Sequence, residues 1–247
     1  MALLALTGVV KRFGAIEAVG GVDLTIEPGE VVGLMGDNGA GKSTLVKMIA
    51  GNFPPDGGSI RIDDHVVHFH RPVEARAKGI EVVYQDLALC DNLSASDNVF
   101  LGRERWQMLL GFIPALNYRG MRDRSRELFD ELKSETRASD TVKRMSGGQR
   151  QAVAIARTRL AQAKIILMDE PTAAISVRQV KEVLDLIHRL KEQNIAVILI
   201  SHRMPDVFAV CDRIVVMRRG RKVADKKIKD SSPEEVTGLI TGAIEAA

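Results

Sequence analysis

The sequence has few aromatic residues, two cysteines and no long apolar run. Aromatic residues make up 4% of the 247 residues, and the cysteines, Cys90 and Cys211, lie far apart without metal-ligand neighbours. We therefore expect reduced thiols in a cytoplasmic protein and assign neither cysteine a role. No stretch approaches about eighteen uninterrupted apolar residues, so we expect no transmembrane helix. The opening MALLALTGVV lacks a basic segment and a cleavage site, which favours a first β-strand over a secretion signal.

A large excess of charge is also missing. The chain has 35 basic and 32 acidic residues, a net charge of +3. This balance does not indicate nucleic-acid binding, so we expect no nucleic-acid partner. Two basic clusters, RGMRDRSR at 119–126 and MRRGRK at 217–222, contain no interleaved aromatic residues, and we interpret them as solvated faces.

Apolar runs bounded by turn residues recur along the chain, as expected for strands that are covered on both faces. They are EVVGLM, IEVVY, KIILMD, IAVILIS and DRIVVMRRG. Helical patterns at 42–51 and 176–193 separate several of these runs, which predicts an α/β fold with a largely parallel sheet. FPPDGGSIRIDDHVVHF predicts an antiparallel hairpin or edge. Residues of about 90–160 have helical stretches and no convincing alternating strand, so we expect an inserted helical subdomain there.

A glycine-rich loop, GDNGAGKST, follows the first of these runs. It matches G-x-x-x-x-G-K-[ST] through Gly36, Gly41, Lys42 and Ser43. Glycines let backbone N–H groups approach phosphate oxygens, and the following helix directs its positive dipole end at the same anion. Lys42 would reach the β- and γ-phosphates, while Ser43 would ligate Mg²⁺. We predict that a nucleoside triphosphate binds to the whole loop: Gly36, Asp37, Asn38, Gly39, Ala40, Gly41, Lys42, Ser43 and Thr44.

The stretch KIILMDEP predicts a buried strand that ends in two carboxylates. Asp169 would hold Mg²⁺ through its water shell, and Glu170 would act as the general base on an attacking water. Two acidic residues could also merely end a strand. The complete phosphate loop upstream favours the catalytic interpretation.

A second phosphate-binding element is SGGQ, at Ser146, Gly147, Gly148 and Gln149. It opens the predicted helix QRQAVAIARTRL, so its glycines and the helix N-terminus form another anion site, with Ser146 as an added donor. One ATP does not need both elements on the same side. We therefore expect a second molecule to complete each nucleotide site.

The ordered set of motifs resembles the ATP-binding-cassette (ABC) ATPases over nearly the whole chain. The family order of phosphate loop, glutamine loop, SGGQ signature, acidic strand and switch histidine corresponds to Lys42, Gln85, Ser146, Asp169-Glu170 and His202. The resemblance implies ATP and Mg²⁺ as cofactors. It further implies that Phe13 stacks on adenine with Ala18 beside it. Gln85 would link Mg²⁺ and the water to a membrane partner, and His202 would contact the γ-phosphate.

The same resemblance implies an α/β P-loop NTPase core with a largely parallel sheet, an antiparallel β subdomain and an inserted α-helical subdomain. We expect a single ABC domain over 1–247. Its nucleotide-binding core would be formed by residues 1–90 and 160–247, and its helical subdomain, which carries the signature, by about 91–159. Two departures from the family pattern are Ser176, where an aspartate is usual, and Met145, where a leucine is usual. The first puts communication between the two nucleotide sites in question, and the second conserves volume.

Three segments narrow the resemblance to bacterial monosaccharide importers of the ribose, xylose and fructose kind. They are DNVFLGRE, EPTAAISVRQV and ISHRMPDVFAVCDRIVVMRRGRKV. We expect a homodimer or a pair with a second ABC subunit, integral membrane permease subunits, and indirectly a periplasmic or extracellular sugar-binding protein. The protein would lie on the cytoplasmic face of the plasma membrane. A soluble ABC ATPase of DNA repair or translation is the alternative, but such proteins usually carry a long coiled coil or a second cassette. Glu170 and His202 disfavour a regulator without turnover.

The only tryptophan, Trp106, lies in the apolar stretch RERWQMLLGFIPAL at 103–116. Its apolar residues could fill the small core of the helical subdomain. Alternatively, they could form an exposed patch that lines a groove for a helix of the membrane subunit.

Overall fold

The computed structural model describes residues 2–173 and 175–244. The chain divides into two compact units, the first drawn from Met1–Val82, Ala163–Glu170 and Ile187–Ala247, the second from Val83–Gln162 and Pro171–Leu186. Within the described residues, no helix combines the length and apolar character needed to cross a bilayer. Cys90 and Cys211 are both free thiols.

A six-stranded sheet forms the centre of the first unit. Its order is β12 (Arg221–Lys227), β11 (Arg213–Arg218), β3 (Val31–Met35), β10 (Ala196–Ile200), β9 (Ile165–Asp169) and β6 (Ile80–Val83). β3 runs parallel to β10 and β11, β10 runs parallel to β9, and β12 is antiparallel to β11. Every residue of β3 and β10 is buried, because both faces of the sheet are covered. The prediction of a largely parallel sheet is confirmed.

A separate antiparallel sheet belongs to the same unit. Its order is β2 (Ile16–Ile26), β1 (Leu4–Phe13), β4 (Gly57–Ile62) and β5 (His65–Val67). The β4–β5 turn contains Asp63 and Asp64 at φ 47° and 62°, a left-handed pair typical of a tight hairpin. The predicted hairpin at this segment and the predicted first strand are both present.

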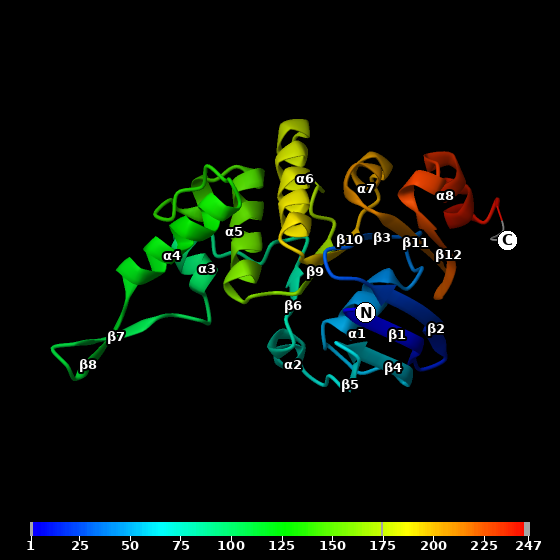
Figure 1. The fold of residues 1–247 in the computed structure, drawn as a ribbon, viewed down its shortest axis with the longest axis horizontal. Coiled ribbons are helices and arrows are strands. Elements are labelled where there is room, and N and C mark those ends of the chain that lie inside the picture. Colours follow the sequence, from blue (N-terminus) through cyan, green and yellow to red (C-terminus); the bar gives the residue numbers. More distant parts are fainter. Residues whose placement is uncertain (1, 174, 245–247) are drawn as a thin grey trace. The chain divides into compact units, whose positions relative to one another are not determined.

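The helices of the first unit are α1 (Lys42–Ile49), α2 (Pro72–Ala77), α7 (Met204–Val210) and α8 (Pro233–Thr241), with a 3₁₀ turn at η2 (Ile228–Asp230). Figure 1 shows α1 on the side of the antiparallel sheet, with α7 and α8 across the six-stranded sheet from it. The main core lies between the two sheets and α1, which contributes Leu45, Met48 and Ile49. α1 stops at Gly51, whose φ of 79° suits a helix C-terminus.

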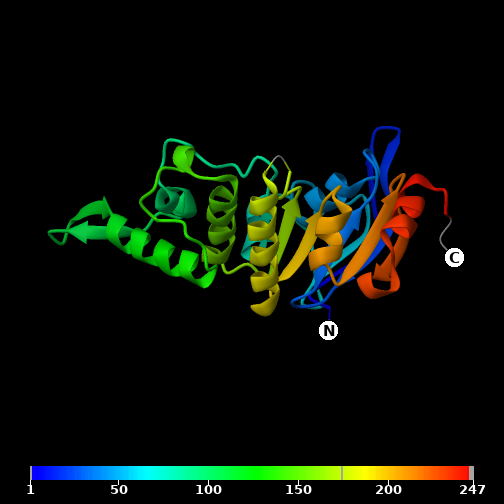
Figure 2. The same ribbon diagram turned by 90° about the horizontal axis from the view of Figure 1, so that it is seen from above.

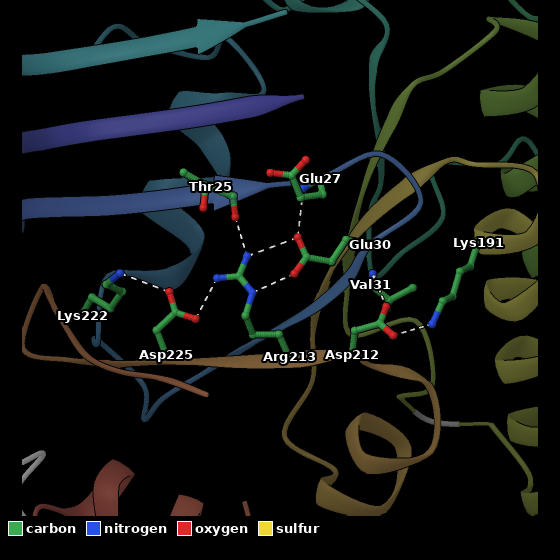
Figure 3. A network of polar contacts seen from close by, with 9 residues as sticks. All are labelled: Thr25, Glu27, Glu30, Val31, Lys191, Asp212, Arg213, Lys222 and Asp225. Atoms are coloured by element: carbon green, nitrogen blue, oxygen red, sulfur yellow. Dashed lines mark hydrogen bonds and ion pairs between the residues drawn. The ribbon is translucent and has the colours of Figure 1, made fainter. Parts of the chain in front are cut away.

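An ion-pair network around Arg213 ties β11 to the starts and ends of neighbouring strands (Figure 3). Its guanidinium contacts Glu30 at 2.7 Å and Asp225 at 2.7 Å and also donates to the carbonyl of Thr25. Arg213 and Glu30 are largely buried. Removing one partner would therefore leave a charge unpaired in a poorly solvated place, which is the costly way to break such a pair. The network lies at the start of β3 and β11, the edge of the sheet opposite the one at which the glycine-rich loop follows β3.

Helices dominate the second unit, which contains α3 (Ala95–Phe100), α4 (Tyr118–Glu131), α5 (Gly147–Leu160), a 3₁₀ turn at η1 (Val142–Arg144) and the first part of α6 (Val177–Glu192). α3, α4 and α5 pack against one another (Figure 2). The centre of this packing is apolar and fully buried. It includes Phe100, Met121, Leu128, Phe129 and Ile155.

A β-hairpin lies between these helices, and the expectation of a helical subdomain at about 90–160 with no convincing alternating strand did not include it. β7 (Trp106–Leu109) pairs antiparallel with β8 (Ile113–Leu116). Leu110 and Gly111 form the turn at φ 53° and 82°. The hairpin has no polar–apolar alternation because neither of its faces is buried, and period-2 alternation marks only strands with one buried face. Trp106 is 65% exposed, so the interpretation of this stretch as a core is wrong.

Candidate active site

The glycine-rich loop joins the end of β3 to the start of α1. Gly36 and Gly41 have φ of 149° and 99°. A Cβ on Gly36 would lie 2.3 Å from the Met217 carbonyl oxygen, and one on Gly41 would lie 2.5 Å from the Ala18 carbonyl oxygen. Both positions therefore exclude any side chain, through backbone conformation and through space.

Lys42 lies in the first turn of α1 and is buried. Its Nζ donates hydrogen bonds to the carbonyls of Gly36 at 2.6 Å and Asp37 at 2.9 Å, so it lies across the loop. Burial lowers the pKa of Lys42, although the negative charges of Glu170, Asp37 and Asp169 oppose that shift. The other predicted loop residues lie around it: Asp37, Asn38, Gly39 and Ser43 are exposed, Thr44 is half-buried and Ala40 is buried.

The acidic pair lies at the end of β9, which β10 separates from β3 in the sheet. Asp169 ends β9 and pairs in register with Ile200, the last residue of β10, while β10 also pairs with β3. Glu170 donates its N–H to the Ile200 carbonyl at 2.9 Å and has φ 49°, a left-handed conformation that is uncommon for glutamate. Parallel neighbours end at the same edge of a sheet. The loop, the acidic pair and the segment after β10 therefore share one edge.

His202 faces Glu170 across that edge. Its Nε2 lies 3.1 Å from Oε1 of Glu170, and its N–H donates to Oε2 at 3.3 Å. Burial raises the pKa of Glu170, and His202 counteracts part of the shift. Within the described structure, Oε1 is buried and accepts no aligned hydrogen bond. A carboxylate with a raised pKa and a free lone pair suits proton abstraction.

Phe13 presents an aromatic face at the end of β1. Its ring is half exposed and meets Phe53 edge to face at a centroid distance of 5.4 Å. The Lys11 ammonium lies 5.8 Å from the Phe13 centroid and is held by Asp56 at 2.7 Å. Ala18 approaches Gly41 through its carbonyl, at the start of α1. Phe53 and Lys11, which sequence reasoning missed, support the ring, and no motif contains them.

The SGGQ segment belongs to the second unit and begins α5. Ser146 Oγ accepts from the Gln149 N–H at 3.2 Å, while Gln149 Oε1 accepts from the Ser146 N–H at 3.0 Å, a reciprocal capping box. The Ser146 hydroxyl proton stays available for a further acceptor. A Cβ on Gly147 would lie 2.8 Å from Ile175 Cγ2, and one on Gly148 would lie 2.2 Å from Glu182 Oε2. The glycines therefore leave room for the start of α6.

Gln85 lies exposed in the loop that follows β6, also in the second unit. Two residues outside the motifs hold this loop in place by hydrogen bonds to its backbone. Asn98 is fully buried and exchanges hydrogen bonds with Cys90, accepting from its N–H at 2.7 Å and donating to its carbonyl at 3.0 Å. Arg157 donates to the carbonyl of Ala88 at 3.2 Å. Asn98 follows the polar Ser96 and Asp97 in the helix segment ASDNVF, so no local pattern in the sequence marks it as a buried residue.

Ser176, the departure noted in the sequence, also caps a helix. It exchanges hydrogen bonds with Gln179: its N–H donates to Oε1 at 2.9 Å and its Oγ accepts at 3.4 Å. An aspartate would make the same cap, since both residues favour this position. The substitution therefore removes a charge and keeps the local structure.

The donor set at the strand ends fits Mg²⁺. The described residues contain no cluster of three or more His, Cys, Asp or Glu side chains with metal-binding geometry. Mg²⁺ does not need one, because it takes one or two protein oxygens and completes its shell with water and phosphates. The exposed Ser43 hydroxyl and the partly exposed Asp169 carboxylate are such oxygens.

Comparisons with known proteins agree with this geometry. A model of the ABC transporter family matches residues 19–173. The fructose import ATP-binding protein FrcA of Rhizobium meliloti is 42% identical over an alignment that covers 98% of this chain and 95% of that protein. The xylose/arabinose import ATP-binding protein XylG of Sulfolobus acidocaldarius is 44% identical, with 97% and 94% covered. The ribose import ATP-binding protein RbsA of Geobacillus kaustophilus is 37% identical, and this chain spans 48% of its length.

Solved structures give the same fold. A nucleotide-free ATP-binding cassette from an ABC transporter superposes with a TM-score of 0.82 at 25% identity, covering 98% of this chain and 96% of that chain. A dimeric ATP-binding cassette in a post-hydrolysis state, bound to ADP and Pi, superposes with a TM-score of 0.73 at 27% identity, covering 91% and 98%. The predicted P-loop α/β fold class is thereby confirmed.

Proposed function

Because this chain belongs to the ABC transporter family, we propose that it hydrolyses ATP to power an importer for a monosaccharide. The observation that carries the proposal is the shared edge of β3, β9 and β10, where Lys42, Glu170 and His202 converge. A phosphate loop and a buried carboxylate at one edge bring an attacking water and a phosphoryl group within reach of the same residues.

The loop would bind the phosphates first. Its backbone N–H groups and the N-terminus of α1 stabilise the negative charge, and α1 has no acidic residue in its first turn to oppose this. Lys42 exchanges its contacts to the loop carbonyls for the β- and γ-phosphates. Phe13 offers its exposed ring to adenine, next to Ala18.

Ser43 and Asp169, together with Gln85, would hold Mg²⁺, which supplies charge neutralisation of the β- and γ-phosphate oxygens. Glu170 accepts a proton from the water that attacks the γ-phosphorus. His202 keeps the carboxylate oriented through its 3.1 Å contact. In our proposal it would also contact the γ-phosphate. ADP and phosphate are then released.

Two cassettes would form each pair of sites. In our proposal Ser146, Gly147, Gly148 and Gln149 of one chain contact the nucleotide held by the Lys42 loop of the other, in a homodimer or with a second ABC subunit. ATP closes the pair and hydrolysis reopens it, which drives integral membrane permease subunits on the cytoplasmic face of the membrane. A periplasmic or extracellular sugar-binding protein delivers the cargo. The similarity to fructose, xylose/arabinose and ribose import proteins supports a monosaccharide.

Reconstitution tests the proposal. The chain is co-expressed with its permease subunits, placed in proteoliposomes, and supplied with a sugar-binding protein and fructose, xylose or ribose. We expect sugar uptake that requires ATP and is lost in Lys42→Ala. ATP hydrolysis without any association with permease subunits would instead favour a soluble ABC ATPase.

A further inference from the structure

The β7–β8 hairpin is the most apolar exposed segment of the described chain. Trp106, Met108, Leu110 and Phe112 are 65%, 67%, 78% and 73% exposed. Figures 1 and 2 show the hairpin continuing beyond the first turn of α4 and pairing with no other strand. Contiguous exposed apolar surface of this kind indicates a binding site.

Both faces of the hairpin are apolar. Directly paired residues share a face, which places Trp106, Met108 and Pro114 on one side and Leu109 with Ile113 on the other. A protein groove usually covers one face of such an element. Lipid acyl chains can surround the whole tip, so they suit an element with apolar side chains on both faces better than a protein groove does.

The turn itself carries an unexpected residue. Leu110 has φ 53° in the three-residue turn 110–112 between the paired Leu109 and Ile113, and a left-handed turn residue is usually Asn, Asp or Gly. Leucine in this conformation carries a backbone cost that asparagine would largely avoid. The apolar side chain at the outermost point of the hairpin is therefore not explained by the turn.

Arginines surround the base of the hairpin. Residues 101–126 contain six arginines and two acidic residues, a formal charge of +4. Arg119 and Arg122, on the first turns of α4, are exposed and make no ion pair with the described part of the chain. Arg105 directly precedes β7, and its guanidinium carbon lies 5.4 Å from the centroid of the Phe100 ring. An apolar tip with a tryptophan, followed by the exposed Arg119 and Arg122, complements the acyl region and the anionic headgroups of a bilayer.

We propose that the β7–β8 hairpin inserts its apolar tip into the interface of an anionic lipid bilayer, with Arg119 and Arg122 contacting lipid phosphates. This adds a direct lipid contact to a protein whose proposed function requires only contact with permease subunits. The proposal does not rest on that function, since lipid binding needs neither ATP nor the permease. This also revises the interpretation of the 119–126 cluster as a merely solvated face.

The sole tryptophan makes the insertion directly measurable. The full chain is mixed with protein-free vesicles of phosphatidylcholine with or without about a third phosphatidylglycerol. We expect a blue shift of Trp106 emission, quenching by lipids brominated on the acyl chain, and co-sedimentation with the anionic vesicles. Leu110→Asn combined with Phe112→Ser should weaken binding about tenfold or more, because it removes apolar area from the tip.

The variants separate insertion from damage to the fold. Leu110→Asn suits the left-handed turn, so its ATP hydrolysis in solution should equal that of the wild type. Val73→Asn, at an exposed apolar position on α2, is the matched control and should bind vesicles normally. Arg119→Ala and Arg122→Ala should each weaken binding to anionic vesicles about fivefold. Unshifted Trp106 emission at saturating vesicles would overturn the proposal, as would loss of permease co-purification in the tip variant without any vesicle binding by the wild type.

Discussion

Glu170 combines three features that rarely occur together in one residue. Its side chain is largely buried and has a raised pKa, its backbone is left-handed, and one of its carboxylate oxygens has no hydrogen-bond partner in the described structure. Each feature costs stability, and strain of this kind gathers at functional sites. The register of β9 and β10 holds Glu170 in place through its N–H bond to Ile200.

Replacing the carboxylate tests its role as the base. Glu170→Gln should lower ATP turnover by roughly 10²- to 10⁴-fold, because the proton acceptor is lost while the shape is kept. ATP affinity should change little, since the amide keeps the volume of the side chain. Turnover is measured by phosphate release and affinity with a fluorescent ATP analogue. Undiminished phosphate release would remove Glu170 from this role.

The same substitution should stabilise the nucleotide-free protein in a pH-dependent way. Because burial raises the pKa of Glu170 in the folded state, its ionisation costs stability once the pH rises above the ordinary value of about 4.3. The cost grows as the pH passes the folded-state pKa and then stays constant. Glutamine does not ionise, so we expect a gain on the order of 0.5–2 kcal/mol at pH 8 that vanishes near pH 4. Denaturant melts at both pH values measure it, and a gain of equal size at pH 4 contradicts the electrostatic explanation.

Phe13 should contribute to affinity for the base and not for the phosphates. Phe13→Ala should weaken ATP binding about 5- to 100-fold, the effect of losing one base–aromatic stack. Binding of inorganic tripolyphosphate, which has no base, should remain at the wild-type level. Calorimetric titration with both ligands makes the comparison, and an equal loss for both would mean that Phe13 supports the loop instead.

At the scale of elements, the capping box of α5 allows the structural role of Ser146 to be tested apart from its proposed contact with a phosphate. Ser146 caps the helix through a lone pair, and only its hydroxyl proton is left for an anion. Asp and Asn cap helices as well as Ser does, so either can replace Ser146 without loss of the helix. Asp is negatively charged and Asn is neutral, so a nearby phosphate would be repelled by Asp and not by Asn.

Ser146→Asp should therefore keep the thermal stability of the protein and abolish ATP hydrolysis, because a carboxylate faces the γ-phosphate of the other chain. Ser146→Asn is the matched control and should retain a measurable fraction of the wild-type rate. Binding of ATP to the monomer should be unchanged in both variants, since the loop around Lys42 is intact. Equal rates for the aspartate and asparagine variants would show that no phosphate approaches Ser146.

Elements with a strong local signal were predictable from the sequence. The five buried strands were recognisable as uninterrupted apolar runs. The loop at Gly36–Thr44 was recognisable as a motif in which close backbone contacts enforce Gly36 and Gly41. The hairpin at Trp106 was not, because an element that buries neither face has no periodicity to detect. The buried Asn98 and the Phe53 ring were missed for a related reason: their partners lie far away in the sequence or in an irregular loop.

At the scale of the whole molecule, one chain carries two sets of nucleotide-binding elements in different units. Lys42, Asp169, Glu170 and His202 belong to the first unit, and Ser146 belongs to the second. In a twofold-symmetric dimer each nucleotide would meet the first set of one chain and the second set of the other. If one chain is defective in its first set and the other chain is defective in its second set, both defects fall at the same nucleotide site.

Mixing two inactive variants tests this arrangement. Lys42→Ala and Ser146→Asp each disable both sites of their own homodimer. A heterodimer of the two has both defects in one site and none in the other. If the sites act independently, an equal mixture should recover about a quarter of the wild-type rate, because half of the dimers are heterodimers with one working site. Mixing Lys42→Ala with Glu170→Gln is the control: both residues serve the same chain's site, so every site in every dimer is defective and no activity returns. Recovery in the control mixture would contradict the shared-site dimer, whereas failure of both mixtures would require the two sites to fire together.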